Sequence, residues 1–358
     1  MHDGPRSWIF FPDFTAGSPY QDCLADALAP QGWKAFAGDI AAAVVAGTQG
    51  PTVFHLGWEQ PVYIGAKVAT EAFALAEAFF GDLDRFLAAG GVLAWTIHNL
   101  KPHEERFPAV NAFMQQGLAQ RADLVHVHNR TGAAHALAMG ARPGAVVLAR
   151  HPSYAEAYPD DITDAAARRY LRLAPEAVVF SFFGAMRGYK GLPRLMRAFD
   201  AASVALPKAR LVVAGRASPP SPMRFAMPNP RLRVLARDIA DAEVQYVIRA
   251  ADCVVLPYEA VLTSGVLALA HGFGRPVIVP DLPSMVEEVV DGVDGFIFKC
   301  GSDDALRNSF RRAADALGDV RGRMRVAARA AVEGRDFASL AAALALGVEC
   351  RFPLHRAA

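Results

Sequence analysis

Cysteine and long apolar runs are scarce in this sequence. The four cysteines are scattered along 358 residues, without the paired spacing of a zinc site, a redox motif or a secreted disulfide framework. No apolar run approaches the ~20 residues that span a bilayer, and the first residues lack a signal-peptide pattern. We therefore expect a cytoplasmic protein whose contact with a membrane is at most peripheral.

Strong net charge and the common catalytic signatures are missing as well. The formal net charge is +1, which gives no basic footprint for nucleic acid. The loop after the first expected strand lacks the three-glycine dinucleotide fingerprint, and the chain has neither an ATPase-type phosphate loop nor a nucleophile-elbow serine. These absences argue against a nicotinamide cofactor, P-loop ATPases and serine hydrolases.

Short apolar runs alternate with amphipathic segments of helical length, a pattern typical of α/β folds with doubly wound parallel sheets. The chain exceeds the size at which one core stops growing. We predict two Rossmann-like domains, residues 1–150 and 151–335, with a linker at 151–161 and a C-terminal helical segment, 336–358, that packs back across the domains. The expected strands are 7–11, 34–37, 52–56, 93–97, 124–128 and 146–148, then 178–183, 210–214, 232–235, 253–256, 277–279 and 295–298.

The most informative segment is residues 181–191. A strand that is apolar on both faces ends at Gly184, and Arg187 and Lys190 follow before a helix. Lysine supplies few of the 37 basic residues, so Lys190 stands against a strong arginine bias. Backbone N–H groups at a helix start and two fixed cations suit a diphosphate. A solvated basic turn is the alternative.

A second turn joins a strand to a helix at residues 257–266. Thr263 and Ser264 can cap this helix, and Gly265 allows close approach of a ligand to the backbone. Glu259 is placed to accept hydrogen bonds from ribose or sugar hydroxyls, and Tyr258 completes the candidate donor-binding set. Ordinary N-capping beside an exposed glutamate is the alternative. The pairing with the basic segment favours a donor site.

In the first half, His98 ends a strand and is followed by His103 and Glu104. A neutral imidazole at position 98 suits hydrogen bonding to a sugar hydroxyl or proton movement, with the other two as acceptor contacts or bases. A zinc site is the weaker interpretation, because no third and fourth ligands appear at a suitable spacing. His126 and His128 alternate on the next strand and are expected to be core histidines satisfied by their neighbours.

The first strand-to-helix loop lies at the same expected edge of the sheet. Asp13 is a candidate general base, and Gly17, Ser18 and Tyr20 are candidate acceptor contacts. Together with the segments above, this loop forms a series of motifs in sequence order. The series comprises residues 17–28, 95–104, 151–159, 183–191, 264–278 and 291–296.

In this order the motifs resemble those of GT-B glycosyltransferases, especially the family 4-like enzymes of bacterial exopolysaccharide assembly, over nearly the whole chain. The resemblance implies two Rossmann-like domains facing across a cleft, with the acceptor on the first and the nucleotide-sugar on the second. It implies transfer of a hexosyl or glucuronosyl group from a UDP- or GDP-sugar to a polyprenyl-diphosphate-linked saccharide. No metal and no cofactor are required, since the nucleotide-sugar is the substrate.

The same resemblance implies work at the inner face of the cytoplasmic membrane. Lys101, Arg106 and Phe107 in the first domain are the candidate contacts to lipid headgroups.

The sequence departs from the family at the donor helix. Many members carry two glutamates there, and this chain has Val261 and Leu269 at those positions. Retention of anomeric configuration is therefore not carried over, and an inverting enzyme would use His98, Asp13 or Glu104 as its base. A GT-B-shaped nucleotide-sugar epimerase and a non-catalytic nucleotide-binding subunit remain as alternatives.

Overall fold

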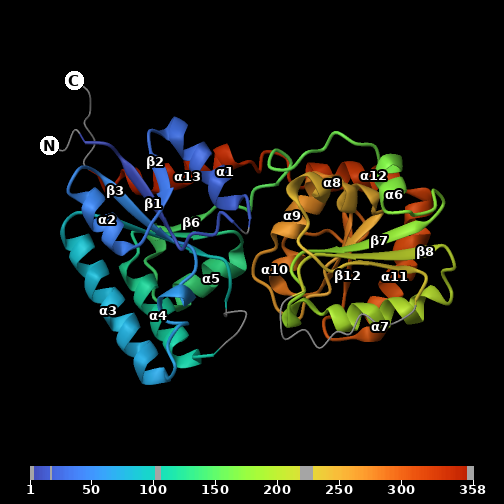
Figure 1. The fold of residues 1–358 in the computed structure, drawn as a ribbon, viewed down its shortest axis with the longest axis horizontal. Helices are drawn as coiled ribbons and strands as arrows, with labels where there is room; N and C mark the ends of the chain where they lie inside the picture. Colours follow the sequence, from blue (N-terminus) through green and yellow to red (C-terminus); the bar gives the residue numbers. More distant parts are fainter. Residues whose placement is uncertain (1–3, 17, 101–105, 218–228, 353–358) are drawn as a thin grey trace. The chain divides into compact units, whose positions relative to one another are not determined.

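A computed structural model describes residues 4–16, 18–100, 106–217 and 229–352 (Figure 1). The chain forms two compact units, one of residues 1–151 with 335–358 and the other of residues 152–334. Each unit is built on a six-stranded parallel sheet. All twelve expected strands are present within one residue of their predicted ends, and the predicted GT-B fold class is confirmed.

The sheet of the first unit has the order β2-β1-β3-β4-β5-β6. Helices α1 and α13 pack together on one face, and α2, α3 and α4 follow one another on the other face (Figure 1). The elements are β1 (Ser7–Phe11), α1 (Tyr20–Leu28), β2 (Lys34–Ala37), α2 (Ile40–Gly47), β3 (Thr52–Leu56), η2 (Gln60–Val62), α3 (Ala69–Ala88), β4 (Val92–Ile97), α4 (Pro108–Arg121), β5 (Leu124–Val127), α5 (Arg130–Ala138), β6 (Val146–Leu148) and α13 (Phe337–Glu349).

The sheet of the second unit has the order β12-β11-β10-β7-β8-β9. Helices α6 and α8 pack together, as do α7 and α11 across the sheet from them (Figure 1). The elements are α6 (Asp164–Tyr170), β7 (Val178–Phe183), η4 (Gly188–Lys190), α7 (Leu192–Ser203), β8 (Ala209–Ala214), β9 (Leu232–Leu235), α8 (Asp241–Ala250), β10 (Cys253–Val255), α9 (Gly265–Gly272), β11 (Val277–Pro280), α10 (Pro283–Val286), β12 (Gly295–Phe298), α11 (Asp303–Asp319) and α12 (Arg321–Ala330).

Both sheets have a topological switch point. In the first unit the chain leaves β1 for β2 and returns to the other side of β1 at β3. In the second unit it runs from β7 out to β9 and returns beside β7 at β10. Loops on the two sides of such a point diverge, so the carboxyl ends of these strands form a crevice where ligands of open α/β sheets bind.

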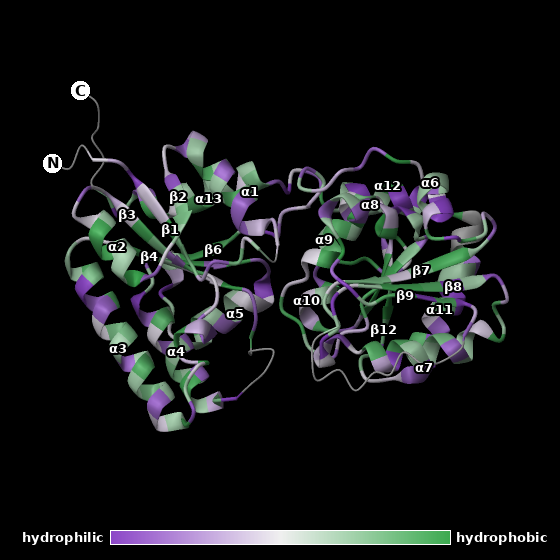
Figure 2. Cartoon of the chain, viewed as in Figure 1, coloured by the Kyte–Doolittle hydropathy of each residue, from purple (hydrophilic) through white to green (hydrophobic). Residues whose placement is uncertain are grey.

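The central strands fold as they do because they are apolar on both faces. In β3 and β4 every residue is buried, and β7 and β8 carry the hydrophobic colour along most of their length in Figure 2. Several helix starts are fixed by side-chain caps: Asp39 accepts from Ala42 N at α2, and Ser302 accepts from Ala305 N at α11. Core burial and local caps therefore specify the same elements.

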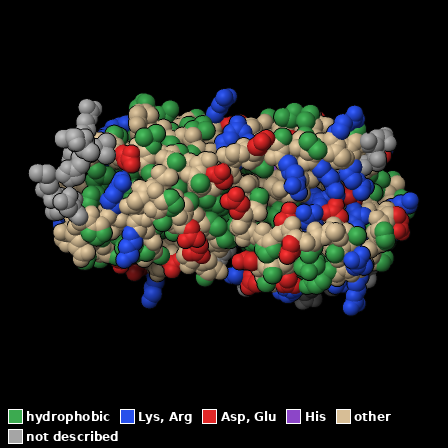
Figure 3. Space-filling model, turned by 90° about the horizontal axis from the view of Figure 1, so that it is seen from above, with side chains coloured by type: hydrophobic (Ala, Val, Ile, Leu, Met, Phe, Trp, Pro, Cys, Tyr) green, Lys and Arg blue, Asp and Glu red, His purple; other side chains and the backbone are tan. Residues whose placement is uncertain are grey.

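Arginines in the second unit are largely engaged in ion pairs. Asp164 is held by Arg275 and by Arg325, the latter at 2.7 Å, and buried Asp252 binds Arg168 at 2.8 Å. On the face shown in Figure 3, basic and acidic side chains are interspersed.

The C-terminal helix α13 contacts α1, β5 and β6, so this part of the chain completes the first unit. Among the described residues, none of the helices has the length and apolar character needed to cross a bilayer.

Candidate functional site

The switch point of the second unit brings Gly184, at the end of β7, against the side chain of Lys190. Gly184 has φ +110°, and a Cβ at this position would lie 2.9 Å from Lys190 Nζ and 3.7 Å from a methyl of Val266. Val266 is the second residue of α9. Lys190 therefore places its ammonium between the carboxyl end of β7 and the start of α9.

The Lys190 ammonium is well shielded and has no carboxylate partner among the described residues. It lies 5.7 Å from the centroid of the Tyr258 ring, and the side chain forms none of the ion pairs of the second unit. Burial, together with the charge of Arg187, lowers the pKa of Lys190 to about 8. Arg187 is exposed and is likewise unpaired within the part of the chain that the structure describes. An anion would satisfy both cations.

The two predicted donor segments lie against each other. The Glu259 N–H donates to Tyr189 O at 2.8 Å. Gly191 has φ +65°, and a Cβ there would lie 2.0 Å from Pro257 O, so only glycine permits this approach. The loop after β10 is therefore fixed to the turn that carries Lys190.

Helix α9 begins beside this turn. Ser264 Oγ accepts from Leu267 N at 3.2 Å, so Ser264 is the N-cap that the sequence predicts. The N–H groups of Gly265 and Val266 belong to the first turn and have no intrahelical acceptor. Thr263 Oγ1 is buried and has no hydrogen-bond partner among the described residues. These groups face the same end of the sheet as Lys190.

Tyr258 and Glu259 have different surroundings. Tyr258 is buried, which raises the pKa of its hydroxyl. The Glu259 carboxylate is more than half exposed and lies 3.6 Å from Arg194, which also binds Asp303 at 2.6 Å. Glu259 thus points toward a cation on α7. Position 269 of α9 is a leucine that packs in the core, so the helix has no carboxylate at this position.

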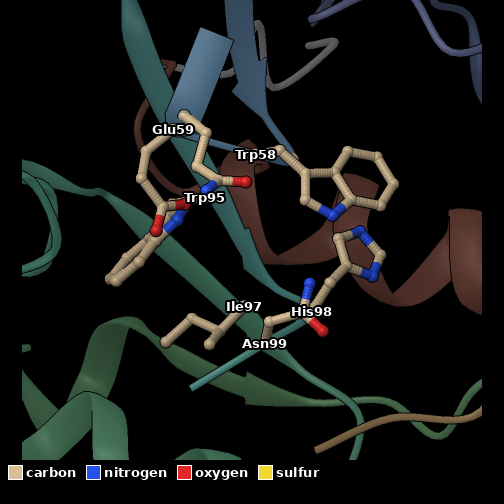
Figure 4. Close-up of a pocket in the computed structure, with 8 residues that line it drawn as sticks. Trp58, Glu59, Trp95, Ile97, His98 and Asn99 are labelled. Carbon is tan, nitrogen blue, oxygen red and sulfur yellow. The ribbon is translucent and has the colours of Figure 1, made fainter. Parts of the chain in front are cut away.

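In the first unit, His98 follows β4 and lies flat against the Trp58 indole, which follows β3 (Figure 4). The ring centroids are 4.2 Å apart and the planes differ by 9°. Burial, reinforced by His126, His151 and His55, holds the pKa of His98 well below its ordinary value. His98 is therefore a neutral imidazole at pH 7. Phe14 packs edge-on against Trp58 at 4.4 Å.

The remaining candidates of the first loop are engaged locally. Asp13 is fully exposed and accepts from the Thr15 hydroxyl at 2.7 Å and from its N–H at 3.0 Å, and these bonds lower the pKa of Asp13. Ser18 Oγ accepts from Tyr20 N at 3.3 Å. Tyr20 is buried, and its ring contacts His98 and other aromatic residues. The candidates outside the described residues are Gly17, Lys101, His103 and Glu104.

A line of buried hydrogen bonds crosses this sheet from β1 to the end of β6. Trp8 Nε1 donates to His55 Nδ1 at 3.0 Å, so neutral His55 carries its proton on Nε2 and donates to Thr96 Oγ1 at 2.7 Å. The Thr96 hydroxyl donates to His126 Nδ1 at 3.0 Å, and His126 Nε2 donates to Ala149 O at 3.0 Å. Each histidine is held as one neutral tautomer.

This line confirms that His126 is a satisfied core histidine. For His128 the expected burial is confirmed, but neither ring nitrogen has a partner at hydrogen-bond geometry among the described residues. Its ring lies 4.4 Å from that of His126 and 5.3 Å from that of His98. Whether a histidine has a hydrogen-bond partner on a neighbouring strand cannot be inferred from residue spacing along the sequence.

A pocket that the sequence interpretation missed opens at the carboxyl ends of β3 and β4 (Figure 4). It is small, with a cavity volume of about 10 Å³, which is room for about one water molecule. It is lined by Trp58, Glu59, Trp95, Ile97, His98 and Asn99, among others. Glu59 is buried, and burial raises the pKa of its carboxyl group. The sequence feature that could have identified Glu59 is its position soon after a buried strand, at the carboxyl end where ligands bind.

Comparisons with known proteins agree with this architecture. Residues 177–315, within the second unit, match the family described as Glycosyl transferases group 1. A comparison with curated proteins gives no match. Among solved structures, Anabaena Alr3699/HepE in complex with UDP is 18% identical with a TM-score of 0.70, covering 96% of this chain and 99% of that chain.

Two further structures have the same fold. The sucrose-phosphate synthase of Thermosynechococcus elongatus is 15% identical with a TM-score of 0.71, covering 97% of this chain and 98% of that chain. A glycosyltransferase from Rickettsia africae is 10% identical with a TM-score of 0.66, covering 97% and 98%. Residues 177–315 of the second unit are thus similar to group 1 glycosyltransferases, in a chain with the GT-B fold.

Proposed function

We propose that this protein is a glycosyltransferase that moves a sugar from a nucleotide-diphosphate donor to an acceptor hydroxyl. The observation that carries the proposal is Lys190, a shielded ammonium without a carboxylate partner at the switch point of a group 1 glycosyltransferase domain. The N-terminus of α9 adds unpaired N–H groups at the same place. The structures of Alr3699/HepE with UDP and with UDP-glucose support a uridine nucleotide as the first candidate.

In this mechanism the second unit binds the diphosphate and the first unit binds the acceptor. Negative charge grows on the diphosphate as the bond to the sugar breaks, and Arg187, Lys190 and the start of α9 stabilise it. Interactions that strengthen in the transition state raise the rate. The acceptor oxygen bonds to the sugar carbon, its proton leaves to a base, and the electron pair of the broken bond leaves with the diphosphate.

His98 and Asp13 remain our proposed bases from the sequence. His98 is neutral at pH 7 and partly exposed, so a ring nitrogen can accept a proton, although burial lowers its pKa. Asp13 is fully exposed, and its hydrogen bonds from Thr15 lower its pKa as well. Glu104 was proposed with them and lies outside the described residues. The reaction requires no metal in this scheme. Within the described residues, no three His, Cys, Asp or Glu side chains are grouped as a metal site requires.

We further propose a polyprenyl-diphosphate-linked saccharide as the acceptor, in exopolysaccharide assembly, with peripheral contact to the cytoplasmic membrane. Arg106 remains a candidate for headgroup contact, and its guanidinium lies 4.9 Å from the centre of the Phe107 ring. Flotation with anionic vesicles tests this part: no association at low salt contradicts it.

Calorimetric titration of the full chain with UDP, followed by transfer assays with UDP-glucose, tests the central proposal. We expect UDP to bind, and we expect Arg187→Ala to lower turnover. Lys208→Ala is the matched control, because Lys208 is exposed and directly precedes β8, at the opposite end of the strands. Donor turnover without an acceptor would identify an epimerase, and binding without turnover would identify a nucleotide-binding subunit.

A further inference from the structure

A group of arginines in the second unit carries more positive charge than its carboxylates compensate. Among the described residues, four arginines share two carboxylates, so the group has an excess of two positive charges. We call these six side chains the arginine cluster. It consists of Arg249, Arg275, Arg325, Arg329, Asp160 and Asp164.

Asp164, the first residue of α6, contacts three of these arginines. Arg325 lies 2.7 Å and Arg249 3.3 Å from its oxygens, and Arg275 binds it through both terminal nitrogens. Burial raises the pKa of Asp164, but the bonds and charges of Arg275 and Arg325 outweigh burial and lower this pKa to about 2. One carboxylate therefore faces three guanidinium groups.

Asp160 compensates the remaining charge only in part. It pairs with Arg249, and it lies 3.8 Å from Arg329. The N–H of the next residue, Asp161, donates to Gln245, and the Asp161 carboxylate forms no ion pair with a described residue. Within the part of the chain that the structure describes, Arg329 thus has only a distant ionic partner.

Two N–H donors of the cluster are unused. The Nε–H groups of Arg275 and Arg325 are buried and have no hydrogen-bond acceptor among the described residues. Burial lowers the pKa of Arg275 to about 10, the bond to Asp164 opposes this shift, and the charges of neighbouring arginines add to it. Buried charge without a full set of partners is costly, so an additional anion would stabilise the cluster.

The cluster is accessible from the side of α12. The Arg329 side chain is 56% exposed and that of Arg325 is 29% exposed. A Cβ at Gly274 would lie 2.7 Å from Arg329 Nε, so this glycine leaves the space that the arginine occupies. On the face of the second unit with α6, α8 and α12, basic side chains gather with acidic ones between them (Figure 3). A small ligand can therefore reach two of the guanidinium groups.

The cluster lies away from the candidate donor site. Arg249 is in the last turn of α8, just before β10, and Arg275 lies just before β11. Lys190 and Ser264 instead follow the carboxyl ends of β7 and β10. Since these strands are parallel, the two sites are at opposite ends of the sheet.

We propose that the arginine cluster binds a small free oxyanion of the phosphate class, such as inorganic phosphate or diphosphate. Guanidinium groups present paired N–H donors that match phosphate oxygens, and the charge excess matches a divalent anion. A flat bilayer surface would not reach Arg275, whose side chain is 2% exposed. The site goes beyond the proposed function, which uses the other end of the sheet.

Calorimetric titration of the full chain, saturated with UDP to fill the donor site, tests the proposal with phosphate and diphosphate at an ionic strength held constant with chloride. We expect at least one of them to bind. Arg329→Gln should weaken this binding about 10-fold, the lower end of the factor for a hydrogen bond to a charged group. Arg323→Gln is the matched control, because Arg323 is exposed on the same helix and forms no ion pair with a described residue. This control loses the same charge and should change the affinity less than about two-fold.

Urea unfolding without the anion separates binding from a folding defect. Arg329→Gln removes one uncompensated positive charge, so this variant should be at least as stable as the wild type. A clear loss of stability would show that Asp160 needs Arg329, and it would remove the charge excess on which the proposal rests.

Failure of both anions to bind would overturn the proposal, as would equal weakening by Arg329→Gln and Arg323→Gln. Diphosphate that binds the free chain but not the UDP-saturated chain would occupy the donor site alone, which also contradicts it. If UDP itself does not bind, the proposed function fails, and the same titrations without UDP still test the cluster.

Discussion

Lys190→Met is expected to stabilise the ligand-free protein and at the same time to weaken UDP binding. Burial lowers the pKa of Lys190 from 10.5 to about 8. Each pKa unit corresponds to about 1.4 kcal/mol, so the charged ammonium destabilises the folded protein by about 3 kcal/mol. Methionine has a similar length and no charge, so the variant should recover up to this amount.

The pH dependence has a definite sign. Below pH 8 Lys190 is protonated in both the folded and the unfolded chain, so the full destabilisation is present. Between pH 8 and 10.5 the folded protein releases this proton first, and its stability rises. The difference in free energy of unfolding between the variant and the wild type should therefore be largest below pH 8 and should shrink above it.

UDP binding, in contrast, should favour the wild type over the variant. The ammonium gains an anionic partner that methionine cannot bind, and a hydrogen bond to a charged group contributes about 1.5–3 kcal/mol. We expect the UDP dissociation constant to rise about 10- to 100-fold. Urea unfolding and calorimetric titration at pH 7 measure the two effects.

Lys208→Met, at an exposed lysine at the other end of the strands, should change neither quantity. If Lys190→Met lowered the stability of the ligand-free protein and left UDP affinity unchanged, Lys190 would be a structural residue and the reasoning would be refuted.

Other expectations follow from the same geometry. Gly184→Ala should cost about 1 kcal/mol or more and weaken UDP at least about ten-fold, because its Cβ would displace the Lys190 ammonium; unchanged UDP titrations would contradict this. Thr96→Val should lower the free energy of unfolding by about 2–6 kcal/mol, since it leaves two buried histidine nitrogens unpaired; Thr96→Ser should restore most of the loss in urea unfolding. The first unit should lose stability as the pH falls below 6.5, because burial lowers the pKa of His55 to about 3 and of His126 to about 4, so the unfolded chain binds protons first. The four tryptophans all lie in this unit, and their fluorescence reports the transition; stability that stays constant from pH 7 to 5 would contradict the expectation.

The strands and the donor segment were predictable because their signals are local. A parallel strand covered on both faces is an apolar run, as β7 is, and glycine marks its end. The positive φ of Gly184 and the cap at Ser264 reflect chemistry within a few residues along the chain. Such features can be inferred from one sequence.

The pocket of the first unit was not predictable in the same way. Glu59 is buried, and Gln115, 56 positions away along the chain, donates a hydrogen bond to its carboxylate. His126 has a hydrogen-bond partner on a neighbouring strand, whereas no described residue is such a partner for the His128 ring. These properties depend on how distant segments meet, and spacing along the chain does not contain them.

The strongest single test of the donor site is a crystal structure of the protein with UDP. We expect diphosphate oxygens within hydrogen-bonding distance of Lys190 Nζ and of the N–H groups that open α9. Density for UDP at any other place, with Lys190 still lacking an anionic partner, would contradict it.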